Sequence, residues 1–287
     1  MEDNLISSRS WPAPAKLNLF LHVTGRRPDG YHLLQTVFQF IDYSDLLDFT
    51  VRPDGKLLRN SNYAGISIED DLVIRTAKFL QTETGCDLGA EISVHKRIPV
   101  GGGLGGGSSD AATTLVALNQ LWGLGLSTER LARIGLQLGA DVPVFVRGHA
   151  AWAEGVGEKL APIEPEECWY LVICPDCHVS TAEIFAAAEL TRNTPAITIR
   201  DFLTSGGHND CEPVVRHRYP QVAEALDWLG QHADARMTGT GSCIYAGFNS
   251  QEQVVTISRK MPHRWLGFVA EGKNRSPLLQ RLERENN

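Results

Sequence analysis

The feature that most constrains this chain is the stretch 101–107, in which six of seven residues are glycine. Because glycine has no Cβ, it reaches backbone conformations closed to other residues and lets another group approach the main chain closely. Residues 91–98 alternate apolar and polar side chains, which predicts a strand, and residues 111–121 read as a helix. A strand, a glycine loop and a helix N-terminus in this order are typical of a phosphate-binding site.

The residues after the loop suit the start of that helix. Ser108 or Ser109 can cap it. Asp110 follows where the positive end of the helix dipole favours an acid. A side chain introduced at Gly103 or Gly106 is expected to block the approach of phosphates.

Two common phosphate loops fit only in part. Gly101, Gly103 and Gly106 satisfy G-x-G-x-x-G, but that dinucleotide fold needs a second strand with an acid about 20 residues later. Here another helix is expected from Ser127 instead. The P-loop pattern ends in Gly-Lys-Ser/Thr, but here the residue directly before Ser108 is Gly107 and not a lysine. The loop therefore indicates phosphate binding of another type.

The composition narrows the class of partner. A chain of 287 residues is long enough for two domains. The net charge of −7 disfavours broad contact with nucleic acid or an anionic membrane. No apolar run approaches the ~18 residues of a membrane span, and residues 1–4 lack the basic start of a signal peptide. We expect a cytoplasmic protein with small-molecule partners only; the oligomeric state stays open.

One cysteine pair matches a cofactor pattern. Cys174, Cys177 and His178 form C-x-x-C-H, as in c-type haem attachment. Haem attachment needs export, for which no signal is visible, and zinc would need a further ligand pair at metal spacing. We interpret the pattern as the end of a strand over 169–174 that runs into a turn.

Two ionisable residues are candidates for chemistry. Residues 15–23 alternate as a half-buried strand, which puts Lys16 and Asn18 on one face. That face could be solvated, or it could hold a substrate hydroxyl or carboxylate. Asp141 is a lone acid within the small and apolar segment 139–145. It could cap a short turn before Pro143, or it could act as a desolvated base.

The remaining pattern predicts an α+β protein of two domains, residues 1–163 and 164–287, divided by the composition shift at 162–167. The second half reads as an α+β, ferredoxin-like arrangement. The expected N-terminal elements are a loose terminus (1–10), strands 33–41 and 45–52 that complete an antiparallel meander, an exposed loop (60–65), helices 71–83 and 127–138, and a hairpin over 150–163. The expected C-terminal elements are strand 169–174, helices 181–190 and 213–229, strands 234–238 and 243–248, helix 251–260, strand 264–270 and a polar, frayed tail (271–287).

Several separated stretches resemble the GHMP kinases. The segment 14–19 resembles the first motif of that family, and the loop at 99–109 resembles its ATP motif. Asp29-Gly-Tyr-His32 resembles in particular the branch that phosphorylates 4-diphosphocytidyl-2-C-methylerythritol. Segments 139–145 and 237–243 are similar to the catalytic segment of that branch and to its third motif.

This resemblance implies a two-domain fold, with an N-terminal half like ribosomal protein S5 domain 2 and a ferredoxin-like C-terminal half. It implies transfer of the γ-phosphate of ATP to the 2-hydroxyl of 4-diphosphocytidyl-2-C-methylerythritol, in non-mevalonate isoprenoid synthesis. Lys16 and Asp141 would be the catalytic pair. The implied substrate residues are Asn18, Tyr31, His32, Thr181 and Phe185; the implied ATP site comprises Pro99, Val100, Gly101, Gly102, Gly103, Leu104, Gly105, Gly106, Gly107, Ser108 and Ser109.

The chemistry of these residue types agrees with the resemblance. Phosphoryl transfer depends mainly on positioning and charge stabilisation. A carboxylate at Asp141 could accept the hydroxyl proton, and Lys16 would keep that carboxylate ionised. Magnesium is expected with ATP; its ligands stay open, with Ser109 a candidate. The alternatives are another GHMP kinase, such as a mevalonate or homoserine kinase, and a nucleotide-binding protein without catalysis.

Overall fold

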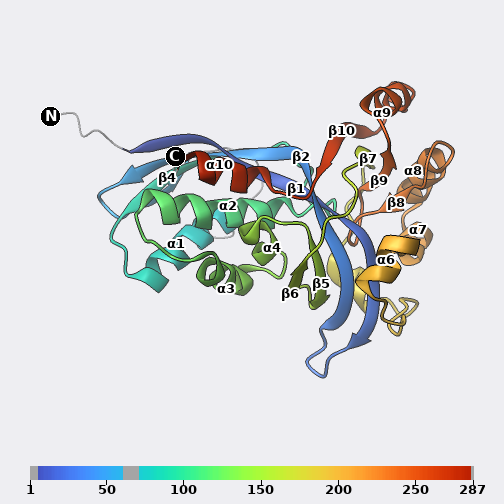
Figure 1. The fold of residues 1–287 in the computed structure, drawn as a ribbon, viewed down its shortest axis with the longest axis horizontal. Helices are drawn as coiled ribbons and strands as arrows, with labels where there is room; N and C mark the ends of the chain where they lie inside the picture. The colour runs from blue at the N-terminus through green and yellow to red at the C-terminus, as the bar shows by residue number, and fades with distance from the viewer. Residues whose placement is uncertain (1–5, 61–70, 286–287) are drawn as a thin grey trace.

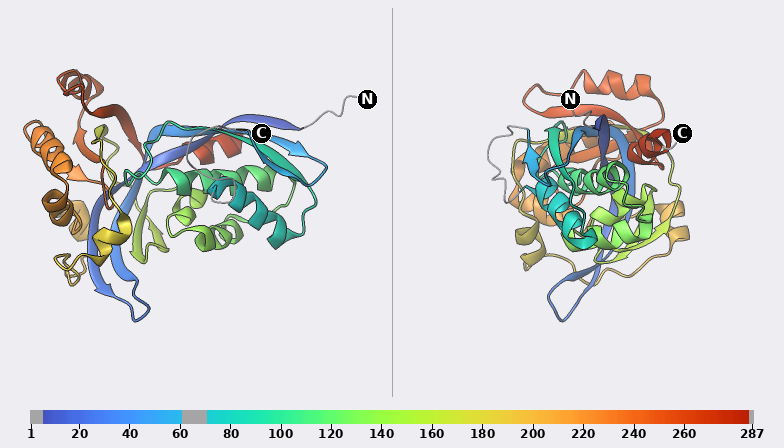
Figure 2. Two further views of the ribbon diagram at one scale, coloured as in Figure 1. Left: turned by 180° about the vertical axis from the view of Figure 1, so that it is seen from behind. Right: turned by 90° about the vertical axis from the view of Figure 1, so that its left-hand side faces the viewer.

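The computed structural model describes residues 6–60 and 71–285. The loop predicted for residues 60–65 therefore lies, apart from Asn60, outside the described residues. Figures 1 and 2 show an elongated molecule whose two halves lie end to end, with a long N-terminal hairpin that passes from one half into the other. The strands of both halves belong to one sheet, because β10 (Leu266–Lys273) pairs with β2 (His32–Arg52) as well as with β7 (Trp169–Cys174).

The hairpin is made of β1 (Ser7–Arg26) and β2. The prediction of two strands at 33–41 and 45–52 is wrong, because β2 is continuous. Its pairing with β1 jumps from Pro14 opposite Ser44 to Lys16 opposite Phe40. The intervening residues thus form a bulge, which bends the strand without ending it. The terminus is also more ordered than predicted, since β1 begins at Ser7.

Most of the other N-terminal elements were predicted. Their bounds are β3 (Leu57–Arg59), α1 (Leu72–Thr84), β4 (Gly89–His95), α2 (Gly106–Leu121), α3 (Thr128–Leu138), α4 (Val142–Arg147), β5 (Ala151–Gly155) and β6 (Lys159–Pro162). Of these, β3 and α4 were not predicted, and α2 begins earlier than the predicted residue 111. Asp71 caps α1, and Gly85 ends it in the left-handed conformation. Ser127 caps α3. Helices α1 to α4 cover one face of the sheet (Figure 1), and the apolar side chains between the two layers form the N-terminal core.

The C-terminal half has the ferredoxin-like order of elements, with antiparallel neighbours β10-β7-β9-β8. Its bounds are α5 (Thr181–Ala186), α6 (Ile199–Ser205), α7 (Glu212–Arg218), α8 (Pro220–Gly230), β8 (Arg236–Met237), β9 (Ile244–Phe248), α9 (Gln251–Ser258) and α10 (Pro277–Glu285). The predicted helix 213–229 is split at Tyr219, because Pro220 cannot donate a backbone hydrogen bond and starts a new helix. The helix predicted at 181–190 ends early, because α5 stops at Ala186. Helix α6 was not predicted.

The two halves exchange parts of their cores. Leu21 and Val23 of β1 belong to the apolar cluster of the C-terminal half. At the other end of the chain, α10 returns to the N-terminal half, where Leu278 is buried in the first core (Figure 1). The prediction of a frayed tail over 271–287 is therefore wrong for residues 271–285. The predicted domain boundary at 163/164 falls between β6 and β7 and remains a prediction.

The docking of α10 can be tested by removing its buried side chain. Leu278 is 2% exposed, so Leu278→Ala should lower the free energy of unfolding by about 2–5 kcal/mol, measured by urea denaturation. Leu203→Ala is the matched control, because Leu203 is 58% exposed on α6 and should change stability by less than about 0.5 kcal/mol. Equal stabilities of the two variants would mean that the tail is frayed after all.

Candidate active site

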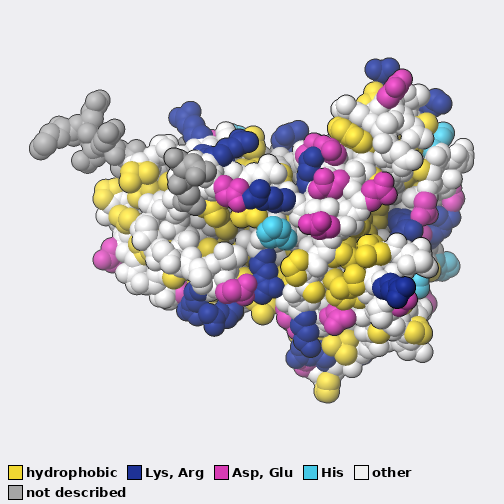
Figure 3. All heavy atoms as spheres, viewed as in Figure 1, with side chains coloured by type: hydrophobic (Ala, Val, Ile, Leu, Met, Phe, Trp, Pro, Cys, Tyr) yellow, Lys and Arg dark blue, Asp and Glu magenta, His cyan; other side chains and the backbone are white. Residues whose placement is uncertain are grey.

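Two cavities adjoin at the glycine loop, and the larger of them is lined by residues of both halves of the molecule. The larger has a volume of about 750 Å³ and the smaller about 350 Å³. Both are lined by Gly103 and Gly105, so the glycine loop forms the wall that they share. On the face drawn in Figure 3, basic and acidic side chains are interspersed. A polyanion would therefore be bound by local groups and not by a broad basic surface.

Lys16 lies at the centre of this arrangement. Its side chain is buried, and its Nζ donates hydrogen bonds to Asn18 Oδ1 at 2.6 Å and to the Gly103 carbonyl at 2.9 Å. The same Nζ lies 3.5 Å from Asp141 Oδ2. The structure thus brings the two predicted catalytic residues together. Burial lowers the pKa of Lys16, and the nearby carboxylate of Asp141 opposes that shift.

Asp141 combines features of both interpretations made from the sequence. It occupies the N-cap position of α4, before Pro143, but its side chain makes no capping hydrogen bond. The carboxylate instead faces Lys16 and lines the larger cavity, with 33% of the side chain exposed. An ionised carboxylate that is partly open to a cavity and adjoins an ammonium can accept a proton from a bound hydroxyl.

Asn18 is held by its neighbours as firmly as Lys16. Its Oδ1 accepts from Lys16, and its Nδ2 donates to Thr36 Oγ1 at 2.9 Å. The Thr36 hydroxyl in turn donates to the carbonyl of Phe20. Asn18 therefore orients the ammonium of Lys16, and its contact with a substrate remains a prediction.

The glycine loop leads directly into α2. The helix begins at Gly106, with Gly105 as a left-handed N-cap. The prediction that Ser108 or Ser109 caps the helix is wrong, because both lie within its first turn. Three loop glycines, Gly101, Gly103 and Gly105, have positive φ, which other residues rarely adopt. The first N–H groups of a helix have no partner within the helix, which makes a helix N-terminus a common position for anion binding.

The predicted ATP residues are not equivalent in the structure. The smaller cavity is lined by Pro99 to Ser108, whereas Ser109 is fully buried and lines neither cavity. A Cβ at Gly103 would lie 2.3 Å from the Thr238 carbonyl oxygen, and one at Gly106 would meet Ile98 at 3.1 Å. Those two positions are therefore constrained by packing. Gly107 is more open, since its nearest neighbour would be Leu72 at 4.0 Å.

A buried charge cluster beside the loop was missed from the sequence. Lys96 Nζ lies 2.5 Å from Asp45 Oδ2 and 2.8 Å from Asp110 Oδ2. Asp110 thus pairs with a lysine. The prediction that it lies at the positive end of the helix is wrong, because α2 begins at Gly106 and has no acid in its first turn. Burial raises the pKa of Asp110 to about 7, although Lys96 acts in the opposite direction. Only the fold brings residues 45, 96 and 110 together.

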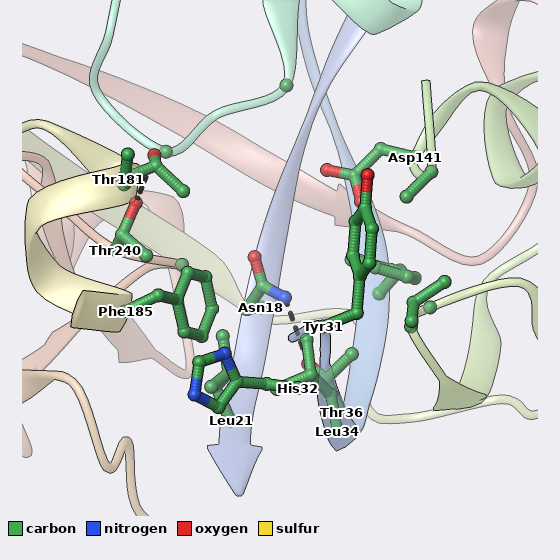
Figure 4. Close-up of a pocket in the computed structure, with 18 of the residues that line it drawn as sticks. Asn18, Leu21, Tyr31, His32, Leu34, Thr36, Asp141, Thr181, Phe185 and Thr240 are labelled. Carbon is green, nitrogen blue, oxygen red and sulfur yellow. Dashed lines mark hydrogen bonds between the residues drawn. The ribbon is translucent and has the colours of Figure 1, made fainter. Parts of the chain in front are cut away.

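The remaining predicted substrate residues line the larger cavity together. Tyr31 and His32 come from the end of the β1–β2 hairpin, and Thr181 and Phe185 come from α5 (Figure 4). His32 stacks on Phe185 with ring centroids 5.0 Å apart. Tyr31 is 66% exposed, which leaves its ring open to contact with a ligand. This end of the cavity can hold a flat ring.

Two neighbours of these residues were not singled out from the sequence. Thr240, in the glycine turn 239–242, shares a 2.8 Å hydrogen bond with Thr181. Arg192 donates to His32 from the segment after α5. The glycine turn was a usable signal for Thr240. Arg192 lies in a stretch without periodicity, so no pattern marked it.

The described residues hold no group of three or more His, Cys, Asp or Glu placed to bind a metal. The six cysteines form no disulfide. The strand predicted at 169–174 is confirmed, since β7 ends at Cys174. No helix in the described ranges is long and apolar enough to cross a membrane.

Comparison with known proteins matches both halves of the chain to one family. Residues 71–149 match the GHMP kinases N terminal domain, and residues 187–266 match the GHMP kinases C terminal family. The 4-diphosphocytidyl-2-C-methyl-D-erythritol kinase of Shewanella sp. (strain W3-18-1) is 58% identical over 96% of this chain and 97% of its own length. The kinase of the same name from Nitrosococcus oceani is 58% identical over 96% and 98%.

Solved structures support the same grouping. A crystal structure of 4-(cytidine 5'-diphospho)-2C-methyl-D-erythritol kinase superposes with a TM-score of 0.79 at 29% identity, covering 93% of this chain and 99% of its own. Methanococcus jannaschii mevalonate kinase, at 15% identity and a TM-score of 0.67 over 96% and 100%, shares the fold. The chain therefore belongs to the GHMP kinases, in the branch of the 4-diphosphocytidyl-2-C-methyl-D-erythritol kinases.

Proposed function

We propose that this protein transfers the γ-phosphate of ATP to the 2-hydroxyl of 4-diphosphocytidyl-2-C-methyl-D-erythritol, in the non-mevalonate route to isoprenoid precursors. The observation that carries the proposal is the contact of Lys16 with Asp141, 3.5 Å apart, where the glycine-loop cavity meets the larger one. The names of the 58% identical relatives support the choice of substrate.

Each cavity has a role in this reaction. The triphosphate would lie along the glycine loop, with its γ-phosphate toward the shared wall at Gly103 and Gly105. The hydroxyl of the acceptor would approach from the larger cavity, where Asp141 Oδ2 accepts its proton. Lys16 would then stabilise charge on the oxygens between which the phosphoryl group moves.

Magnesium fits this site as an ion carried by the nucleotide. Mg²⁺ keeps several waters and is usually held by substrate phosphates with one or two protein oxygens. Ser109 Oγ makes no hydrogen bond to the described residues but is fully buried away from both cavities, whereas Ser108 lines the smaller one. We therefore propose Ser108 in place of Ser109 as the side chain nearest the ion. When bound, the ion would neutralise charge on the phosphates.

The role of Asp141 can be tested by removing its basic oxygen. Asp141→Asn should leave ATP affinity unchanged and slow turnover roughly 100- to 10,000-fold, because a positioned base contributes that much. Asp87→Asn makes the same change on an exposed residue of the loop after α1 and should be silent. Steady-state kinetics with ATP and the cytidylated substrate measures both. Normal turnover of Asp141→Asn would remove Asp141 from the mechanism.

The phosphate path can be tested at Gly107, where a side chain has room. Gly107→Val should raise the KM for ATP roughly tenfold or more, because Gly107 lines the smaller cavity and an added side chain would take up space that we propose for the phosphates. Gly230→Val is the matched control, since Gly230 is an exposed glycine of α8 with open space around it. An unchanged ATP affinity for a folded Gly107→Val protein would show that the phosphates bind elsewhere.

The choice of acceptor can be tested by phosphorus NMR with ATP and magnesium. We expect a new phosphate signal with the diphosphocytidyl substrate and very little with free methylerythritol phosphate, which lacks the ring that Tyr31 and His32 would bind. Comparable phosphorylation of mevalonate or homoserine would place the activity elsewhere in the GHMP kinases. No ATP turnover with any acceptor would indicate a binding protein.

A further inference from the structure

Arg192 makes an unusually complete set of hydrogen bonds behind the larger cavity. Its Nε donates to His32 Nε2 at 3.1 Å. Its two Nη groups donate to three carbonyls of the segment that carries Phe185, at 3.0 Å to Leu190, 2.9 Å to Phe185 and 2.6 Å to Ala187. The guanidinium is thereby held in one orientation, and it holds the end of α5 against His32.

This contact determines which nitrogen of His32 carries the proton. A guanidinium has only donors, so His32 Nε2 must accept from Arg192. In a neutral imidazole the proton then lies on Nδ1. Burial lowers the pKa of His32, and the charges of Arg192 and Arg26 lower it further, which keeps the ring neutral.

The protonated nitrogen is the one available to a ligand. One face of the His32 ring is covered by Phe185, at an interplanar angle of 22°. Figure 4 shows one ring nitrogen turned toward the interior of the pocket and the other turned away. Since Nε2 is taken by Arg192, which does not line the cavity, the inward nitrogen is Nδ1.

We propose that Arg192 is a positioning residue that fixes His32 as its Nδ1–H tautomer and so makes the pocket select cytosine over uracil. The selection part rests on the proposed function. Cytosine N3 is an acceptor and can take a hydrogen bond from Nδ1–H. Uracil carries a proton on N3, so the same pose would place a donor against a donor and leave both unpaired, which is costly in a buried site.

The simpler alternative is that Arg192 only caps the carbonyls at the end of α5. Such a role would hold Phe185 in place and affect binding of either base alike. The two roles therefore differ in the tautomer of His32 and in the ratio between bases, and both can be measured.

The first experiment needs no substrate. In the protein labelled with ¹⁵N, the ring shifts of His32 at pH 7.5 should report a protonated Nδ1 and an unprotonated Nε2. Arg192→Leu should lose this single form and give a mixture of tautomers. Arg218→Leu is the matched control, because it removes an exposed ion pair with Glu189 close to the same segment and should leave His32 unchanged. A protonated Nε2 in the unmodified protein would overturn the proposal.

The second experiment compares kcat/KM for the diphosphocytidyl substrate and its uridine counterpart. The preference for cytidine should fall roughly tenfold or more in Arg192→Leu, the usual size of one misplaced hydrogen bond, while KM for ATP stays the same. Equal losses for both bases would leave Arg192 with the capping role only. Absence of turnover in the unmodified protein would refute the proposed function, whereas the NMR result would still test the tautomer.

A further pair of variants keeps the test valid if Arg192→Leu does not fold. The amide nitrogen of asparagine lies near the place of Nδ1, and that of glutamine lies near the place of Nε2. His32→Asn should therefore keep more of the cytidine preference than His32→Gln. The reverse order would mean that Nε2 faces the base, and the proposal would be wrong.

Discussion

The arrangement of the site depends on the buried ammonium of Lys16. An ammonium removed from water is stable only if its three protons meet acceptors. Here the acceptors are Asn18 on the same strand, the Gly103 carbonyl in the glycine loop and the Asp141 carboxylate at the start of α4. One charge thus joins three segments that are far apart in the sequence, and the groups proposed to surround the reacting atoms are held in place by the protein itself.

The long hairpin sets the distance between the two ends of the site. β1 carries Lys16 near its middle, and the connection to β2 carries Tyr31 and His32 at its end. Because both ends of the site lie on the same pair of hydrogen-bonded strands, the distance between them is fixed by a rigid element. Only a substrate of matching length could contact both ends. α5 completes the far end with Phe185, and Arg192 ties that helix back to the hairpin.

The glycine loop also joins the halves of the molecule. Gly102 accepts a backbone hydrogen bond from Cys243, and a Cβ at Gly102 would lie 2.3 Å from the sulfur of that residue. Glycine is therefore required there for close packing against the C-terminal half. The open approach that we propose for phosphates lies nearer to Gly107. The loop proposed to bind the nucleotide is consequently fixed by the half of the molecule that supplies Thr181 and Phe185.

The sequence by itself determined the features that arise from local interactions. The helix caps at Asp71, Ser127 and Gly85, the β5–β6 hairpin and the strand–loop–helix order around the glycines follow from residue types at short spacing. The motifs also indicated the family and the residues of the candidate site.

Only the tertiary structure decided where side chains distant in the chain meet. Four features depend on contacts between residues far apart in the chain. They are the bulge at which β2 bends without ending, the cluster of Lys96 with Asp45 and Asp110, the docking of α10 and the contact of Arg192 with His32. Such contacts are set by the packing of whole elements, and no periodicity in either segment records them.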